Sequence, residues 1–415
     1  MKNVIVIGGG AAGLMAAVSA AEHGAASVTI LEKMPAVGRK LLITGKGRCN
    51  LTNHCDVSGL VKNMPGNGSF LYSAFHSFGN QDLVNFLARW GLETKVERGG
   101  RVFPVSDRAH DVVRTFLRML EKLNIRLLTG QKVEQLTVVD GRITEAITTT
   151  GRYPGEEFIL ATGGASYPGT GSSGDGYRIA AALGHQIIDI RPSLAPLEVA
   201  EEWVKELQGL SLKNVQATLL SEGKKIAAEF GEMLFTHFGL SGPIILSLSH
   251  NASRLLTQHP DRELTIEINL KPALSEEQLD KRLQRDFAQF SRKQLKNSLH
   301  ELLPSKMIPV MIDLSFLDPD KFVHQLTRTE RLRLMQKLQH LSFTVTATRP
   351  ISEAIVTAGG VHVKELDASS MRSRLLDNLF FAGELIDIDG YTGGFNLQAA
   401  FSTGFVAGRS AAESF

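Results

Sequence analysis

The chain has 415 residues, of which 43% are hydrophobic and 21% are charged. This composition is ordinary for a globular protein, and the length suffices for two or three domains with a large core. The formal net charge of +2 excludes a global field that would recruit nucleic acid or an anionic membrane. The only cysteines, Cys49 and Cys55, form no Cys-x-x-Cys pair. A disulfide scaffold is therefore not indicated, and we expect a cytoplasmic protein.

The N-terminal segment 4–21 carries no charged residue and follows Lys2. By hydropathy alone, such a run is typical of a signal peptide or a short membrane span. It also contains four glycines in a phosphate-loop pattern, and Glu22 and His23 follow it. A buried parallel strand that runs into a buried helix explains the same apolarity, so we expect no association with a membrane.

A strand–helix–strand pattern opens the chain. The continuous apolar run Val4–Ile7 predicts a strand, the run Ala11–His23 predicts a helix, and Ser27–Leu31 predicts a second strand. This order is the beginning of a dinucleotide-binding fold.

Gly8, Gly10 and Gly13 form a G-x-G-x-x-G motif between that strand and that helix. The first glycine permits a tight turn, the second lets the backbone approach a pyrophosphate, and the third lets the helix pack on the strand. The helix N-terminus supplies N–H donors for phosphate. Glu32 ends the second strand, where a carboxylate accepts hydrogen bonds from ribose hydroxyls and repels a 2′-phosphate. A glycine turn without a ligand is the alternative interpretation.

The segment 38–50 combines glycines with four cations. Such a loop can neutralise a pyrophosphate while its backbone passes close to an aromatic ring, although a solvated basic loop is the alternative. Cys49 lies in this loop without a second cysteine two residues away, so a packed cysteine is favoured over a redox thiol.

Further elements follow in chain order. Apolar spacing predicts helices at 83–90 and 111–123, and strands at 125–128, 132–139, 142–149 and 157–160, with a hairpin turn at Asp140 and Gly141. Short alternating runs at 215–220, 226–229 and 264–269 predict an antiparallel, barrel-like insert. Between 274 and 341 the pattern is helical, with capping boxes at Ser275/Gln278 and Thr327/Glu330. A strand at 341–348 and a last helix at 396–414 complete the chain.

A second glycine-rich stretch, 161–164, ends the strand at 157–160. Residues 169–174 also match G-x-G-x-x-G, but they follow the strand by several residues and lack a downstream strand–helix–strand unit. We interpret them as a loop. No separate nicotinamide-binding Rossmann unit is visible in the sequence.

The C-terminal part carries a third glycine-rich stretch. Gly383 and Glu384 end a strand at 379–382, and Glu384 is the best candidate to accept hydrogen bonds from ribityl hydroxyls. Asp387 and Asp389 are interpreted as loop caps. Gly393 and Gly394 then open the last helix, whose first N–H groups suit the flavin N1 and C2 carbonyl, where negative charge gathers on reduction. The two chain ends together therefore predict one FAD site.

Four side chains are candidates for substrate orientation or proton transfer: Lys46, Arg48, Tyr167 and His237. His237 stands between aromatic residues, and a structural histidine is an equally good interpretation. No cluster has metal-ligand spacing, and no G-x-S-x-G motif or P-loop occurs. Residues 271–349 hold 14 Lys/Arg against 9 Asp/Glu, which we interpret as a solvated helical face.

The chain resembles the aminoacetone-oxidase-like family of NAD(P)/FAD-dependent flavoproteins, which includes a reductase of bile-acid precursors. The specific marks are segments 38–50, 161–164, 235–243 and 381–398, in this order. The loop near Asp175 is also similar to the wider fumarate-reductase-like class. Lys46 stands where the family loop has a neutral residue. The motifs and the resemblance together give this cofactor-binding set: Gly8, Gly10, Ala11, Ala12, Gly13, Glu32, Lys33, Arg39, Lys40, Thr44, Gly45, Gly47, Arg48, Cys49, Asn50, Val133, Ala161, Thr162, Gly163, Gly383, Glu384, Gly394, Phe395, Asn396 and Leu397.

The resemblance implies an α/β fold, with a Rossmann-like FAD-binding domain of the glutathione-reductase type. This domain comprises 1–190 and 350–415. The inserts are a β-barrel at 191–270, a small helical domain at 271–340 and a return strand at 341–349.

We expect an oxidoreductase that transfers hydride through noncovalent FAD to or from a small organic substrate, with NAD(P)H as a dissociable donor. An amine oxidase that forms hydrogen peroxide, a tRNA-modifying flavoprotein and a non-turnover interaction protein are the alternatives. No nucleic acid partner is expected. The sequence does not indicate an oligomeric state.

Overall fold

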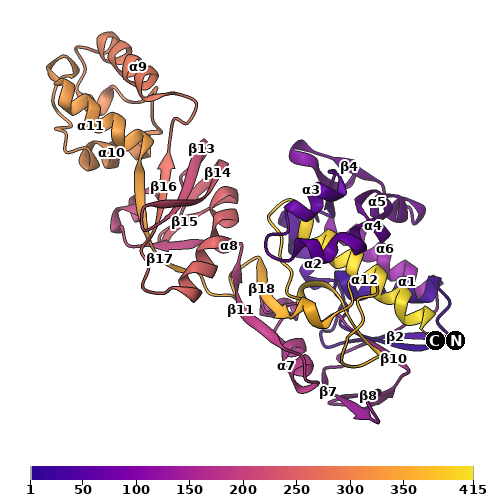
Figure 1. Ribbon diagram of the computed structural model, residues 1–415. Coiled ribbons are helices and arrows are strands. Elements are labelled where there is room, and N and C mark those ends of the chain that lie inside the picture. Colours follow the sequence, from indigo (N-terminus) through magenta and orange to yellow (C-terminus); the bar gives the residue numbers. More distant parts are fainter. Residues whose placement is uncertain (1, 415) are drawn as a thin grey trace. The chain divides into compact units, whose positions relative to one another are not determined.

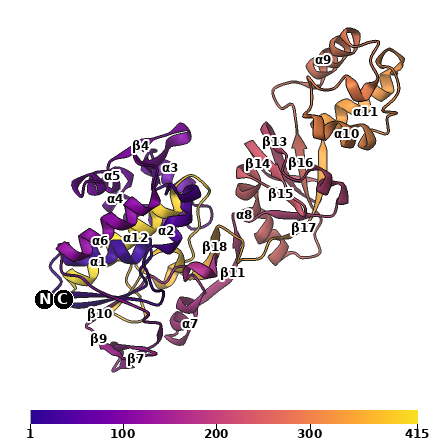
Figure 2. The same ribbon diagram turned by 180° about the vertical axis from the view of Figure 1, so that it is seen from behind.

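The computed structural model describes residues 2–414, which divide into two compact units. The first comprises residues up to 193 together with those from 351, and the second comprises 194–350. The chain therefore leaves the first unit, forms the second and returns. Each unit has its own hydrophobic core. Figures 1 and 2 show the elements of both units from opposite sides. No helix of the described residues is long and apolar enough to span a membrane.

A parallel five-stranded sheet forms the centre of the first unit. Its strand order is β19 (Leu379–Phe381), β10 (Glu157–Leu160), β1 (Asn3–Ile7), β2 (Ser27–Glu32), β6 (Arg126–Thr129). The middle strands are continuous apolar runs because helices and loops bury them on both faces. Since the strands are parallel, the turns that follow β1, β10 and β19 meet at one edge of the sheet. The three glycine-rich stretches lie in these turns or soon after them.

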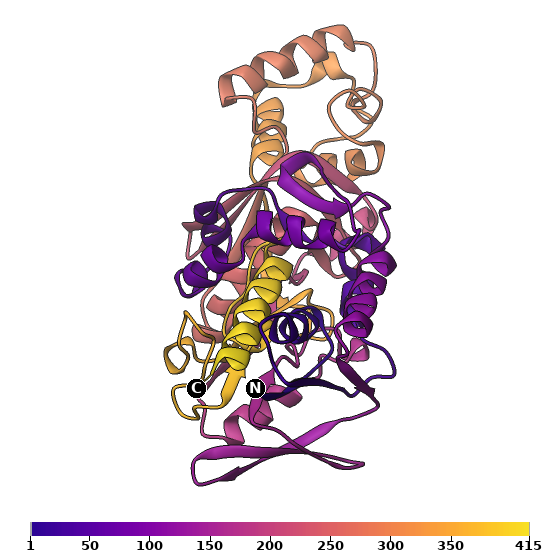
Figure 3. The same cartoon turned by 90° about the vertical axis from the view of Figure 1, so that its right-hand side faces the viewer.

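Two helices from opposite ends of the chain pack together beside this sheet. In Figures 1 and 3 the yellow helix α12 (Phe395–Glu413) lies beside the indigo helix α1 (Ala11–Glu22). A Cβ atom at Gly404 would lie 2.4 Å from the Ala12 carbonyl oxygen, and one at Gly408 would lie 2.2 Å from that of Ala16. Only glycine permits this close approach, which joins the C-terminal segment to the N-terminal one.

The remaining elements of the first unit surround the sheet. The helices are α2 (Arg39–Ile43), α3 (Val57–Lys62), α4 (Tyr72–Ser77), α5 (Asn80–Arg89), α6 (Ala109–Lys122) and α7 (Asp175–Ala182). The strands are β3 (Thr52–Asn53), β4 (Thr94–Val96), β5 (Arg101–Pro104), β7 (Val133–Val139), β8 (Arg142–Thr148), β9 (Arg152–Pro154), β11 (Ile187–Ser193) and β18 (Val356–Val361). The predicted hairpin between β7 and β8 is confirmed, with both turn residues in the left-handed region.

A buried histidine packs against strand β19. The Nδ1 atom of His185 lies 3.1 Å from a carboxylate oxygen of Glu365, and its Nε2 atom lies 3.0 Å from the Ser373 hydroxyl. The ring stands edge-on to Phe381 with the centroids 4.8 Å apart. Burial lowers the pKa of His185 from its ordinary value of 6.5.

Stability should therefore depend on pH through His185. Because the unfolded chain holds this proton more tightly, the stabilisation is complete above pH 6.5 and is lost as the pH falls toward the lowered folded pKa. We expect the difference in unfolding free energy between the wild type and His185→Gln to narrow over this window, as measured by urea unfolding. The substitution His110→Gln, at an exposed histidine, serves as the control. A difference that stays constant from pH 7.5 to 5 would contradict this prediction.

The second unit contains a closed antiparallel barrel. Its strand order is β12 (Leu197–Val199), β15 (Gly239–Ser241), β14 (Lys224–Phe235), β13 (Ser211–Ser221), β16 (Leu264–Asn269), β17 (Leu341–Thr348). In β16, Leu264, Ile266 and Ile268 are buried and alternate with more exposed residues, which confirms the predicted strand pattern. The sequence predicts only strands between 191 and 270, and this is wrong for α8 (Pro243–Gln258). A proline in the first turn and the buried apolar positions 244, 245, 248, 252 and 255 were the signal for this helix.

The helices α9 (Glu276–Gln289), α10 (Ile308–Leu314) and α11 (Arg328–Gln339) follow the barrel strand β16. The capping box at Ser275 is confirmed, because its hydroxyl accepts from the Gln278 N–H at 3.2 Å and its own N–H donates to the Gln278 side chain at 2.9 Å. The box at Thr327 is confirmed in the same way. Its partner Glu330 also accepts from Lys321, which lowers the pKa of Glu330 to about 2.

Candidate cofactor site

In the glycine turn after β1, a side chain would have space at one glycine position and would clash at two others. A Cβ at Gly8, whose φ is +107°, would lie 2.4 Å from the Ala161 carbonyl oxygen, and one at Gly13 would lie 1.8 Å from that of Gly8. Nothing lies within 4 Å of a Cβ built at Gly10. Gly10 is the N-cap of α1 and provides no side-chain cap for the first N–H groups of that helix. This open space at a helix N-terminus suits the pyrophosphate of FAD.

Glu32 is held rigidly at the end of β2. Its carboxylate oxygens accept hydrogen bonds from the N–H groups of Gly9 at 2.6 Å and Met34 at 2.7 Å. The Glu32 carbonyl oxygen accepts from the Gln131 N–H at 2.9 Å, which places the start of β7, with Val133, beside this turn. Two residues of the predicted set from separate segments are thus brought together. The remaining lone pairs of the carboxylate suit ribose hydroxyls.

Lys33 is paired within the protein. Its ammonium group lies 2.5 Å from the Asp175 carboxylate and also contacts the Ser173 hydroxyl. These contacts join the loop before α7 to the end of β2. Lys33 therefore orders the loop 169–175, and its charge is balanced there by Asp175.

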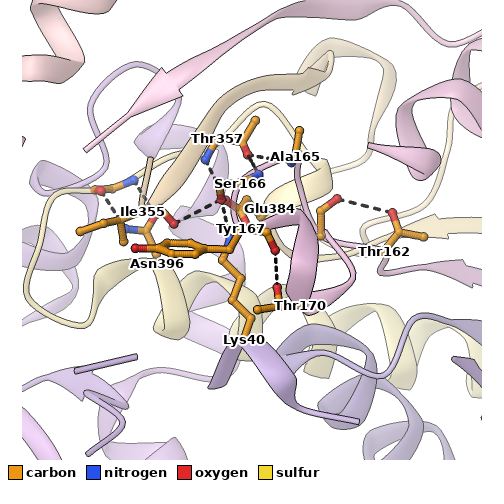
Figure 4. A network of polar contacts seen from close by, with 12 residues as sticks. Lys40, Thr162, Ala165, Ser166, Tyr167, Thr170, Ile355, Thr357, Glu384 and Asn396 are labelled. Carbon is orange, nitrogen blue, oxygen red and sulfur yellow. Dashed lines mark hydrogen bonds and ion pairs between the residues drawn. The ribbon is translucent and has the colours of Figure 1, made fainter. Parts of the chain in front are cut away.

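A polar network joins Lys40 to Glu384, residues from opposite ends of the chain (Figure 4). The Lys40 ammonium donates to Glu384 at 2.7 Å and to the Ser166 hydroxyl at 2.7 Å. The other Glu384 oxygen accepts from the Thr357 N–H at 2.7 Å and from Ser166 at 3.2 Å. The Thr357 hydroxyl accepts from the N–H groups of Ala165 and Ser166. Ser166 and Thr357 are polar partners that the sequence analysis missed, since neither lies in a glycine motif.

The loop after α2 has an unusual backbone. Gly45, Lys46, Gly47 and Cys49 all have φ between +56° and +84°, and Lys46 is exposed. A Cβ at Gly45 would lie 3.0 Å from the backbone nitrogen of Asn50. The Cys49 side chain is fully buried, and burial raises the pKa of its thiol to about 12. Such a thiol stays protonated at neutral pH, so the predicted packed cysteine is confirmed.

Arg48 is engaged by acidic residues of the same unit. Its guanidinium group donates to Asp107 at 2.8 Å and to Glu97, and it lies 4.1 Å from the centre of the Phe103 ring. The guanidinium lowers the pKa of Glu97, while Lys95 and Arg48 together lower the pKa of Asp107. Arg39 differs, since its side chain makes no hydrogen bond or ion pair with any residue between 2 and 414. Of these two cations, Arg39 is therefore the better candidate for a phosphate.

Buried polar atoms without a partner lie near the start of α12. Gly394, with φ +103°, caps this helix, and a Cβ there would lie 2.4 Å from the Thr52 carbonyl oxygen. The Thr52 hydroxyl and the Asn50 side-chain oxygen are buried and have no hydrogen-bond partner among the described residues. Together with the first N–H groups of α12, they fit the polar edge of a flavin ring. Thr52 was not predicted from the sequence.

Asn396 has a positioning role in the loop before α12. Its side-chain oxygen accepts from the Gly390 N–H at 2.8 Å, and its amide donates to the Gly390 carbonyl at 2.7 Å. The Asn53 amide donates to the Gly393 carbonyl at 3.1 Å. These bonds hold the loop that presents the helix N-terminus.

Tyr167 and His237 lie in different units. Tyr167, in the first unit, has φ +53° and is 37% exposed, and its carbonyl accepts from Thr170. His237, in the second unit, is exposed in a turn that Thr236 closes through two hydrogen bonds with Gly239. In the part of the chain that the structure describes, no group of three or more His, Cys, Asp or Glu residues is arranged to hold a metal ion.

Residues 2–410 match the family described as "HI0933-like protein Rossmann domain". The chain belongs to this family. It is 33% identical to the 3-dehydro-bile acid delta(4,6)-reductase of Clostridium scindens over 100% of both chains. It is 30% identical to the ribosomal RNA dihydrouridine synthase of Haemophilus influenzae over 98% of this chain and 97% of the relative. The Escherichia coli synthase of the same name is also 30% identical, over 97% and 96%.

The fold is similar to that of a 3-ketosteroid delta1-dehydrogenase from Sterolibacterium denitrificans, with a TM-score of 0.54, 13% identity and complete coverage of both chains. The predicted fold class is confirmed. The protein is an FAD-dependent oxidoreductase of the HI0933-like family. This broader family replaces the expected aminoacetone-oxidase-like one, because the relatives found do not point specifically to aminoacetone oxidase.

Proposed function

We propose that this protein reduces a carbon–carbon double bond conjugated to a carbonyl group, with NAD(P)H as the electron donor. The observation that carries the proposal is the pair of full-length relatives with different substrates. The first is named as a reductase of the 4,6 double bonds of a 3-oxo bile acid, and the second forms dihydrouridine. In the bile acid, the 4,6 double bonds are conjugated to the 3-oxo group. In uracil, the C5–C6 double bond is conjugated to the C4 carbonyl. In either conjugated system, hydride can add to the β-carbon while a proton adds to the α-carbon.

The proposal assigns tasks to residues of the first unit. The turn at Gly10 and the N-terminus of α1 would hold the pyrophosphate, Glu32 the ribose, and the N-terminus of α12 the flavin edge. FAD supplies hydride transfer when it is bound. The positive end of the α12 dipole favours the extra negative charge of the reduced state.

Four side chains are candidates to donate the proton that the α-carbon receives. Ion pairs with Glu97 and Asp107 raise the pKa of Arg48 further above its ordinary value, so Arg48 is a poor proton donor at neutral pH. Lys46, Tyr167 and His237 have exposed side chains. We propose Tyr167 first, since it lies in the same unit as the cofactor-binding residues and directly follows Ser166, whose hydroxyl contacts both Lys40 and Glu384.

A second candidate substrate is a uracil ring in RNA, which two of the relatives favour by name. The test compares two acceptors under anaerobic conditions with NADH or NADPH. One acceptor is a 3-oxo-4-ene steroid, and the other is ribosomal RNA from cells that lack this gene. The proposal predicts that one of them gains two hydrogens, measured by mass spectrometry of the steroid or of the digested nucleosides. It would be wrong if neither acceptor, nor a simple cyclic enone, were reduced by protein that retains FAD.

A further inference from the structure

An exposed phenylalanine follows the C-terminal end of helix α10 in the second unit. The Phe316 side chain is 81% exposed, and its backbone is left-handed with φ +53°. Its N–H donates to the Asp313 carbonyl at 2.8 Å, and the Leu317 N–H donates to that of Ile312 at 3.1 Å. Glycine is the favoured residue at such a helix end, and a polar residue suits such exposure. Folding alone does not explain phenylalanine at this position.

Phe316 borders a pocket of about 170 Å³ between the end of α10 and one face of α11, two helices that lie side by side (Figure 1). The pocket is lined by Leu314, Ser315, Phe316, Arg333, Gln336 and Lys337. Ser315 is 1% exposed, and its hydroxyl is buried without a hydrogen-bond partner among the described residues. The Nε atom of Arg333 is also buried and has no such partner. Each of these groups has an unmade hydrogen bond, which a polar ligand at this pocket could supply.

The charged side chains that line this pocket are both cations. Arg333 and Lys337 lie four residues apart on α11, and neither makes an ion pair with any residue between 2 and 414. By contrast, the neighbouring Arg331 pairs with Asp280 at 2.7 Å. Like charges at this spacing destabilise an isolated helix. An anion between them would reverse this repulsion.

We propose that this pocket binds a nucleotide unit of single-stranded RNA. The base would stack on Phe316, a phosphate would lie between Arg333 and Lys337, and polar atoms of the nucleotide would satisfy Ser315 and the Arg333 Nε atom. Stacking on aromatic side chains and neutralisation by cations are the two main sources of affinity for single strands. The inference rests on the RNA candidate of the proposed function. The pocket holds the RNA and takes no part in the chemistry.

The test measures binding, so that it does not depend on turnover. FAD-loaded protein is titrated against a labelled, unstructured uridine-rich RNA of about twelve nucleotides, and separately against AMP, by fluorescence anisotropy and competition. Phe316→Ala should weaken RNA binding by about 5- to 150-fold, the range expected for the loss of one stacked base. Phe230→Ala is the matched control, because Phe230 is 63% exposed on β14 and remote from the pocket residues in sequence. Lys337→Gln should reduce the slope of log affinity against log salt by about one.

The variant Phe316→Gly distinguishes a loss of RNA binding from a loss of protein stability. Glycine removes the left-handed strain, so thermal stability should stay equal or rise while RNA binding falls as in Phe316→Ala. Reduction of a free cyclic enone should be unchanged in both variants. RNA affinity that is equal in the wild type and Phe316→Ala would overturn the proposal. AMP binding as tight as RNA binding, with the same dependence on Phe316, would overturn RNA as the source of the nucleotide.

Discussion

Gly10→Val should produce a folded protein that no longer retains FAD. A Cβ at this position meets no atom within 4 Å, and the backbone angles of φ −81° and ψ −171° are open to any residue. The valine side chain would instead fill the space at the N-terminus of α1 that suits the pyrophosphate. Loss of this contact, with the displacement of two phosphates, should weaken FAD binding by at least about 100-fold, or about 2.7 kcal/mol.

Two measurements decide this prediction. Circular dichroism and thermal unfolding of the apoprotein should match the wild type, while the flavin absorbance and the quenching of FAD fluorescence are lost. Gly169→Val is the matched control, because it also has open space around the added side chain and lies in the same unit. The prediction fails if Gly10→Val binds FAD as the wild type does while Gly169→Val behaves normally.

Lys40→Met should destabilise the first unit by about 2 kcal/mol. The Lys40 and Glu384 side chains are 25% and 19% exposed. Removing the cation leaves the Glu384 carboxylate partly desolvated, and among residues 2–414 its remaining partners are only Ser166 and Thr357. Breaking a fully buried ion pair costs about 3 to 5 kcal/mol, and partial exposure reduces this figure. For a unit of this size, the melting temperature should fall by about 4 to 8 °C.

A double-mutant cycle isolates the pair. Lys40→Met combined with Glu384→Gln should cost at least about 1 kcal/mol less than the sum of the single changes, measured by urea unfolding of FAD-free protein. The exposed pair of Lys281 and Glu277, whose side chains are 72% and 77% exposed, is the control. Lys281→Met should cost less than about 0.5 kcal/mol. If the changes in unfolding free energy at Lys40 and Glu384 were additive, the ion pair between them would contribute little to stability.

Local patterns predicted the local parts of the fold. The strand β1, the helix α1 and the strand β2 follow from one apolar run, one glycine motif and one acidic residue, because these signals lie within one continuous stretch of sequence. The capping boxes at Ser275 and Thr327 were predictable for the same reason. Helix α8 was missed because it lies between barrel strands, and its apolar spacing was overlooked among their short alternating runs.

The candidate site was harder to predict, because its contacts are long-range. The sequence marks Arg48 as a cation in a glycine-rich loop, but its partners Glu97 and Asp107 lie in another part of the chain. In the same way, Glu384 has the right residue type for a ribityl hydroxyl, whereas its carboxylate is held by Lys40 across 344 positions. Residue types at glycine turns thus predict where a cofactor lies, and only tertiary packing shows which charges are already paired.

The most direct test of the account is an anaerobic redox cycle of the purified, FAD-loaded protein, followed by its visible spectrum. Addition of NADH or NADPH should bleach the flavin absorbance. One equivalent of an acceptor with a carbonyl-conjugated double bond should then restore it, with one saturated product per FAD. A flavin that NAD(P)H does not reduce, or a reduced flavin that only oxygen reoxidises while amines reduce it, would contradict the account and favour an amine oxidase.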